Sequence, residues 1–355
     1  MNVLPLSKRA EVVAHLTDGA GVRTSSRLCR VHKNTVSSLV LKVGQGYWNL
    51  HNRLVRGLQV HRIEADEMFT NVLIRQANLP PNCDDSEIGE QWVWVGMATA
   101  SKLAISLHVG KRTAESAYIF ARDLRARLAT IPFICTDGLV EYVDAFKTHF
   151  RGAADHARVV KNFGRKKDYD KVAPPRDMVS IEKRVGSGDP DLEAAGTSYV
   201  ERFNLTLRHY LRRLTRRSPG MSKSLRHLKA MLAIFMGVYN FVRPHGSLRC
   251  TPAMEAGLTD HEWTMEEFIE ACLEAEPCPL PVPRALEPHP DANKRKTETK
   301  PEGRGAMRRT STGAVLRAVQ GGKGTPPISK KHIPALARWV QRELFDGLDE
   351  PPKRE

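Results

Sequence analysis

The segment from residue 62 to residue 163 begins with apolar residues that are spaced with the period of strands. Three strand patterns come first, at residues 62–74, 91–98 and 102–110, and the turn TASK joins the last two as an antiparallel pair. A helical pattern, a short apolar strand ending in Asp137, a second helical pattern and a further strand follow. This order of elements predicts a mixed α/β layer arrangement.

The N-terminal segment, residues 6–44, has helical spacing instead and predicts three short helices. Val36, Leu39 and Val40 repeat at i, i+3 and i+4, which places them on the inward face of the third helix. The outward face of that helix carries Asn34, Thr35, Ser38 and Lys42. A helix-turn-helix presents such a face to the DNA major groove, whereas a plain helical bundle explains the same pattern without DNA.

Composition divides the chain into five parts. We expect a helix-turn-helix domain at 1–45, a connecting helix or linker at 46–60, an α/β domain at 61–245, a helical extension at 246–276 and a basic, largely disordered tail at 277–355 with a short helix at 334–348. The tail is assigned from its composition, because residues 286–331 hold eleven Lys and Arg against four acids, with many Gly, Pro, Ser and Thr.

The overall charge indicates a polyanionic partner, because 55 Lys and Arg residues against 40 acids give a net charge of +15. No apolar run of about 18 residues is present, and the first residues do not resemble a signal peptide. These features favour nucleic acid over a membrane surface and predict a cytoplasmic protein. The cysteines form no C-x-x-C pair, so we expect reduced, mostly structural thiols at Cys29, Cys83, Cys135, Cys250, Cys272 and Cys278. The alternative is a zinc site assembled from residues distant in the sequence.

Three carboxylates occupy positions from which they can meet. Asp66 lies in the strand segment RIEADE, Asp137 ends the strand FICTDG, and Glu201 lies on the first turns of a later helix. Three such groups suit one or two hard divalent cations, and a pair of ions can clamp the attacking and leaving oxygens of a phosphoryl displacement. A turn also explains Asp137, and the helix dipole also explains Glu201. Glu64 and Glu67 compete with Asp66 for the role of first ligand.

The helix that carries Glu201, expected at residues 198–217, is strongly basic. Residues 208–229 include eight Lys and Arg and no acid. Like charges one turn apart repel, so phosphates lying alongside explain this run better than a solvated surface does. We expect DNA contacts from Asn204, Arg208, Arg212, Arg213 and Arg216, of which Arg208, Arg212 and Arg216 recur on one side of the helix. His245, in RPHGSL, is expected near the site, with a structural histidine as the alternative.

Six stretches spread in order over about residues 62–267 carry a family resemblance. They are ADEMF, EQWVWVGMATASKLAISLHVGKRTAESA, TDGLVEYVDAF, TSYVERFNLTLRHYLRRLTR, SKSLRHLKAMLAIFMGVYNFVRPHGSLRCTPAMEAG and DHEW. Together they resemble the DDE transposases of bacterial insertion sequences, specifically the insertion-sequence-one family. The block around Glu201 is specific to that family, whereas YNFVRPHGSL recurs across several transposase and integrase families.

The resemblance implies a ribonuclease-H-like catalytic core, preceded by a domain that binds the terminal inverted repeats of an insertion sequence. It implies Asp66, Asp137 and Glu201 as the catalytic, metal-binding triad, with Mg²⁺ as the cofactor and Mn²⁺ as a substitute. The implied reaction is nicking at the transposon ends, followed by attack of the freed 3′-hydroxyl on target DNA. The implied partners are double-stranded DNA, as transposon ends and as target, and further copies of the chain in a homo-oligomer at the nucleoid.

Two positions depart from the family pattern. Phe69 stands where the family has Trp, and Gly89 stands where a second form of the motif has an Asp before EQW, which favours Asp66 as the first acid. The alternative function is that of a sequence-specific DNA-binding protein, either a repressor or a domesticated, inactive transposase. Because all three triad positions are acidic, the sequence favours the enzyme.

Overall fold

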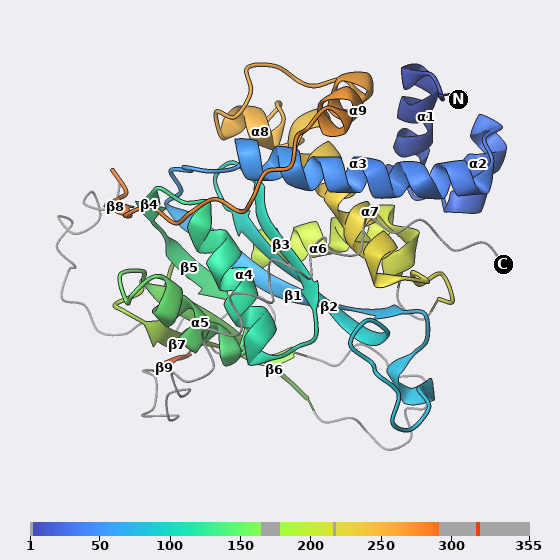
Figure 1. Ribbon diagram of the computed structural model, residues 1–355. Helices are drawn as coiled ribbons and strands as arrows, with labels where there is room; N and C mark the ends of the chain where they lie inside the picture. The colour runs from blue at the N-terminus through green and yellow to red at the C-terminus, as the bar shows by residue number, and fades with distance from the viewer. Residues whose placement is uncertain (1–2, 165–177, 216–217, 291–316, 320–355) are drawn as a thin grey trace. The chain divides into compact units, whose positions relative to one another are not determined.

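Figure 1 shows a computed structural model of the chain, in which a mixed sheet has helices packed around it; the structure describes residues 3–164, 178–215, 218–290 and 317–319. The helices are α1 (Leu6–Thr17), α2 (Val22–Cys29), α3 (Lys33–Leu54), α4 (Ala114–Ala126), α5 (Glu141–His149), α6 (Ser198–Tyr210), α7 (Leu225–Gly237), α8 (Pro252–Glu255) and α9 (Met265–Leu273), with the 3-10 turns η1 (Gln76–Asn78) and η2 (Arg212–Leu214) and the π-helical turn η3 (Val238–Val242). The strands are β1 (Arg62–Val72), β2 (Gly89–Ala98), β3 (Ala104–Gly110), β4 (Thr130–Ile131), β5 (Phe133–Thr136), β6 (His156–Phe163), β7 (Met178–Ser187), β8 (Glu287–Pro288) and β9 (Arg317–Val319). A search of these residues for a membrane-crossing helix finds none.

The main sheet has the strand order β3-β2-β1-β5-β6-β7-β9. Strands β1, β2 and β3 are antiparallel neighbours, and β5 and β6 add beside β1 in parallel. Strand β7 then pairs antiparallel with β6, and the three-residue β9 pairs parallel with β7. The succession of three antiparallel strands and two parallel ones confirms the mixed α/β prediction and is consistent with a ribonuclease-H-like core.

The two faces of the sheet are covered by different helices. On one face Trp94 of β2 packs with its ring centroid 6.2 Å from Phe120 of α4 and 5.4 Å from Tyr142 of α5. Helix α6 contacts β1 and β2, and α7 contacts β3. Asn240 closes the edge at β3, because its side chain both accepts from the Ala104 amide and donates to the Ala104 carbonyl, at 3.0 and 2.9 Å.

The N-terminal helices pack directly on the C-terminal ones. The expected linker from residue 46 is helical as far as Leu54, because α3 is one continuous helix of 22 residues. Glycines in α3 allow a close approach to α7 and α9: a Cβ at Gly44 would lie 2.6 Å from the Ala230 Cβ, and one at Gly46 would lie 1.9 Å from the Cys272 carbonyl oxygen. The described residues up to Val319 group as one compact unit, and an independent domain at 1–45 stays a prediction.

The middle of the chain differs from the sequence analysis in two ways. Strand β7, at Met178–Ser187, was not predicted. The basic helix expected at 198–217 ends at Tyr210, where Leu211 takes an extended conformation and η2 follows. The physical reason is burial, because Leu211 and Leu214 are 1% and 2% exposed and draw the chain into the core.

The expected tail begins in contact with the core. Asn52 of α3 donates to the Cys278 carbonyl at 2.9 Å, and β8 pairs parallel with β4. The composition change at residue 277 therefore does not coincide with a structural boundary. Residues 291–316 and 320–355 lie outside the described residues, and so does the expected helix at 334–348.

Candidate active site

The sheet register brings Asp66 and Asp137 together. Ala65 of β1 pairs with Thr136, the last residue of β5, in the parallel ladder, and the residue that follows each of them in the chain is one of the two acids. Asp137 also has the turn role considered as its alternative, because its Oδ1 accepts from the Leu139 amide at 3.1 Å. The turn orients the Asp137 carboxylate at the carboxyl end of β5, so a role in the turn and a role as an acid of the site are compatible.

A buried glutamate on β1 positions the helix that carries Glu201. Glu64 is 0% exposed, and its Oε2 accepts from the backbone amides of Tyr199 and Val200 at 2.7 and 3.2 Å. These amides belong to the first turn of α6, where backbone N–H groups have no partner within the helix. Glu64, one alternative to Asp66, is therefore engaged in fixing the start of α6, just before Glu201.

The three predicted acids line one pocket. Asp66, Asp137 and Glu201 face a hollow of about 570 Å³, together with the cations Arg112 and Lys161. Strand β1, the end of β5 and the first turns of α6 each supply one acid. The structure thus brings together all three residues that the sequence placed in the triad.

The tightest group of carboxylates beside this pocket includes Glu67, which the sequence offered as an alternative to Asp66. Oxygens of Asp66, Glu67 and Asp137 lie within 4.8 Å of one another. Glu67 follows Asp66 directly in β1, so strand alternation points their side chains to opposite faces of the strand. Glu67 nevertheless comes close to Asp137, just beyond the point where the β1–β5 ladder ends at Ala65 and Thr136.

Glu201 is held within the same pocket by two other contacts. Its Oε1 accepts from the Thr197 hydroxyl and forms an ion pair with Lys161 of β6. Both members of this pair are about one-third exposed, 30% for Lys161 and 39% for Glu201. Such a pair contributes little stability, on the order of 0–1 kcal/mol, so the Glu201 carboxylate can exchange partners at low cost.

Burial and mutual repulsion set the electrostatics of the acids. Burial is the largest cause that raises the pKa of Asp66, to about 7, and the nearby Asp137 carboxylate is the second. Asn204 opposes this rise, because its amide donates to Asp66 Oδ2 at 2.8 Å. Burial also raises the pKa of Asp137 and of Glu67. Arg112 partly neutralises the group, with its Nη2 2.6 Å from Glu67 Oε1 and 3.9 Å from Asp137 Oδ2.

The donor set fits a hard divalent cation. All the converging ligand atoms are carboxylate oxygens, which Mg²⁺ and Mn²⁺ accept. Glu67 Oε2 is a buried oxygen without a hydrogen-bond partner among the described residues, and such an atom costs free energy unless a cation or proton satisfies it. Burial is the largest cause of the raised pKa values of Asp66, Glu67 and Asp137, and neighbouring carboxylates add to it for Asp66 and Glu67.

The predicted recognition residues on α3 lie on its surface. Asn34, Thr35, Ser38 and Lys42 are all exposed, whereas Val36, Leu39 and Val40 are buried, as expected for an amphipathic helix. Helix α2 precedes α3 across the short turn Arg30–His32, in which Arg30 has a left-handed φ of 54°. Two helices joined by a turn are present, and their contact with DNA stays a prediction.

The predicted basic track along α6 needs correction. Arg208 donates to the carbonyls of Leu214 and Phe69 at 3.0 and 3.1 Å. Arg213 donates to Ser222 Oγ and to the His227 carbonyl, and burial lowers its pKa to about 10.

Three residues predicted to contact DNA thus donate hydrogen bonds within the protein. They are Arg208, Arg213 and Asn204, the last of which is buried and donates to Asp66. The helix ends before Arg212, so Arg212 does not continue the face of Arg208, although its side chain is exposed. Arg216 lies outside the described residues.

His245 does not belong to the pocket lining that the structure describes. Its Nδ1 pairs with Ser247 Oγ at 2.9 Å, and its backbone amide donates to the Cys250 carbonyl at 2.8 Å. The structural role considered for it from the sequence fits these contacts better than a role at the site. Sequence reasoning missed Lys161, whose signal was a charge that follows two apolar residues in the strand pattern RVVKNF. It also missed Arg112, which follows β3 closely.

Comparison with known families and proteins adds one similarity. Residues 193–252 match the family model described as integrase core domain. The matched segment contains α6 with Glu201, α7 and η3, and leaves outside it the strands that carry Asp66 and Asp137. Comparison with curated proteins finds no match. The integrase-core similarity supports a protein of the integrase and transposase type, without distinguishing the insertion-sequence-one family from its relatives.

Proposed function

We propose that the protein is a DDE transposase of the insertion-sequence-one type, which nicks DNA at the ends of its element and joins the freed 3′-hydroxyl to target DNA. The observation that carries the proposal is the pocket into which β1, the end of β5 and α6 deliver Asp66, Asp137 and Glu201. The integrase-core similarity, which includes the segment around Glu201, supports the same reaction class.

The catalytic cofactor in this proposal is Mg²⁺, with Mn²⁺ as a substitute. Asp66, Asp137 and Glu201 would hold it, and the carboxylate of Glu67 lies close enough to the first two to assist. A bound divalent ion supplies activation of the attacking oxygen and stabilisation of the leaving oxygen in an in-line phosphoryl displacement. For Glu201 this requires release of Lys161, which the exposure of that ion pair makes inexpensive.

The cations in the pocket have complementary tasks in the proposal. Lys161, once released from Glu201, is a donor on the pocket wall that can hold a phosphate oxygen of the DNA backbone. Arg112 keeps the Glu67 and Asp137 carboxylates in place and stacks 4.7 Å from the Trp92 ring centroid, which fixes the direction of its guanidinium. Asn204 orients Asp66 through its amide donor.

DNA recognition is assigned to the N-terminal helices. The exposed side of α3 has four side chains able to donate to or accept from base edges and phosphates, namely Asn34, Thr35, Ser38 and Lys42. The net charge of +15 supports a polyanionic partner. We therefore propose the terminal inverted repeats as the specific ligand of α3, within a homo-oligomer that joins two ends to a target at the nucleoid.

The test uses the full-length protein and labelled duplexes that carry the inverted repeats flanking its gene. We expect nicking and strand joining that depend on Mg²⁺ or Mn²⁺ and on the repeat sequence. A protein that binds the repeats with high affinity but leaves them intact at every metal concentration would be a DNA-binding protein of the repressor type, and the enzymatic proposal would be wrong.

A further inference from the structure

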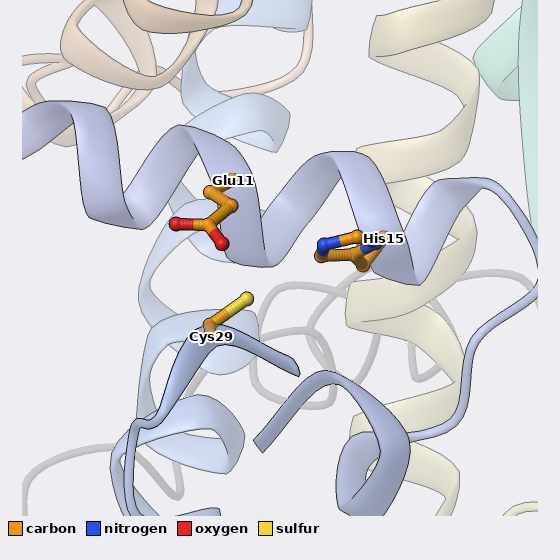
Figure 2. Close-up of side chains that lie close together, drawn as sticks. All are labelled: Glu11, His15 and Cys29. Carbon is orange, nitrogen blue, oxygen red and sulfur yellow. The ribbon is translucent and has the colours of Figure 1, made fainter. Parts of the chain in front are cut away.

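A second group of side chains that can bind a metal lies where α1 and α2 meet, and it precedes the pocket acids in the sequence. Glu11 and His15 stand four residues apart on α1 and so share one side of the helix, and Cys29 is the last residue of α2. One ligand atom from each lies within 4.8 Å of the others. Figure 2 shows the Glu11 carboxylate and the His15 ring on α1 with the Cys29 sulfur facing them from below.

We propose that Glu11, His15 and Cys29 bind a zinc-type divalent transition-metal ion. The donor set is one carboxylate oxygen, one imidazole nitrogen and one thiolate sulfur, all of which Zn²⁺ accepts in tetrahedral sites. The sulfur and nitrogen distinguish this set from the oxygen-only pocket, because Mg²⁺ disfavours both donors. Three protein ligands leave the fourth position to water.

The surroundings allow an ion to enter and the ligands to turn toward it. Cys29 is 0% exposed, whereas Glu11 and His15 are partly exposed and open the group to solvent. Glu11 forms an ion pair with Lys8 at 2.5 Å, in which the side chains are 40% and 37% exposed. A surface pair of this kind is weak, so exchanging Lys8 for a metal ion costs little.

The place of the group indicates what the ion would do. Helix α1 would be linked to the last residue of α2, directly before Arg30 and the turn that leads into α3. An ion that binds only the folded arrangement stabilises it. The site would therefore fix the turn that precedes the exposed side chains of α3, and it requires no cleavage chemistry.

The experiment is a cobalt titration of chelator-treated full-length protein in excess Mg²⁺, which occupies the oxygen-only pocket. We expect a thiolate-to-cobalt charge-transfer absorption that saturates at one ion per chain and disappears when Zn²⁺ is added. Cys29→Ser and His15→Gln should abolish the band, and Glu11→Gln should weaken binding at least tenfold. Cys278→Ser is the matched control, because this partly exposed thiol lies outside the group, and it should keep the band.

Thermal unfolding supplies a second readout that does not depend on the absorption. Zn²⁺ should raise the unfolding midpoint of the parent protein and of Cys278→Ser, and it should leave that of Glu11→Gln, a substitution at a partly exposed position, nearly unchanged. The proposal is overturned if the parent protein shows no charge-transfer band, if the band survives in Cys29→Ser, or if Zn²⁺ stabilises Glu11→Gln as much as the parent.

Discussion

Replacing Asp66 with Asn is expected to stabilise the metal-free protein at pH 8. Burial and the Asp137 carboxylate raise the pKa of Asp66 from its ordinary value of 3.8 to about 7. One pKa unit corresponds to about 1.4 kcal/mol, so ionising Asp66 costs the folded state up to about 4 kcal/mol at a pH above both values. Because the carboxylate lines an open pocket in which water can relax around it, we expect a realised gain of about 1–2 kcal/mol.

The sign of the pH dependence follows from the raised pKa. The folded state binds the Asp66 proton more tightly than the unfolded state does, so this stabilising contribution is complete below about pH 4 and is lost as the pH rises through about 7. The asparagine side chain of the variant does not titrate. The gain from the substitution should therefore be largest at pH 8 and shrink toward pH 5. In thermal unfolding with EDTA we expect a midpoint increase of about 2–8 °C at pH 8.

Metal addition provides the decisive contrast for this variant. Excess Mg²⁺ should raise the midpoint of the parent protein and not that of Asp66→Asn, because the variant lacks a ligand. Asp85→Asn is the control, since Gln76 and Lys111 hold the pKa of this partly exposed acid below its ordinary value and its removal should leave the midpoint unchanged or lower it. A lower midpoint for Asp66→Asn in EDTA at pH 8, or a gain of equal size at pH 5, would refute the reasoning.

Four further substitutions test the contacts around α6 and between α3 and α9. Glu64→Ala leaves two backbone amides at the start of α6 without acceptors, so it should lower the free energy of unfolding by about 2–4 kcal/mol in chemical denaturation and reduce DNA cleavage. Full cleavage by this variant would show that Glu64 does not position the helix. Arg213→Ala should lower the unfolding midpoint and leave the salt dependence of DNA binding unchanged, whereas Arg212→Ala should weaken binding and leave the midpoint unchanged; the reverse pattern would contradict the assignments. Gly46→Ala should cost about 3 kcal/mol or more, because its Cβ would meet a backbone carbonyl of α9, and a variant as stable as the parent would show that the helices separate easily.

The sheet could be predicted because its strands carry strong local signals. The alternation in β1, the apolar runs of β2 and β3 and the short apolar β5 located four strands and hence the positions of Asp66 and Asp137. Strand β7 escaped prediction because it is only partly buried along its length and carries charges at Glu182, Lys183 and Arg184. Its apolar residues are too few to produce a strand pattern without the partner strand β6.

The helix boundaries depended on tertiary contacts that no local pattern contains. Gly44 and Gly46 resemble the end of a helix in the sequence, yet in the fold they let α3 pass close to α7 and α9. The end of α6 is likewise set by the burial of Leu211 and Leu214. Since Arg213 follows this change of direction, its inward position could not be read from helical spacing.

The acids of the candidate site could be predicted from the sequence, whereas the residues that contact these acids could not. The sequence placed three carboxylates at one edge of the sheet, and the pocket contains all three. The approach of Glu67 to Asp137 depends on where the β1–β5 ladder stops, and the Lys161–Glu201 pair depends on the approach of β6 to α6. Both are contacts between segments distant in sequence, which spacing alone does not reveal.

The central claim, that Glu201 takes part in metal-dependent DNA chemistry, is tested most directly by comparing Glu201→Gln with Glu141→Gln. Both glutamates line the same pocket, and each substitution removes one charge with nearly the same shape. We expect Glu201→Gln to abolish Mg²⁺-dependent nicking of the inverted-repeat duplex while binding that duplex normally, and Glu141→Gln to cleave at close to the parent rate. Undiminished nicking by Glu201→Gln, or equal losses in both variants, would contradict the account.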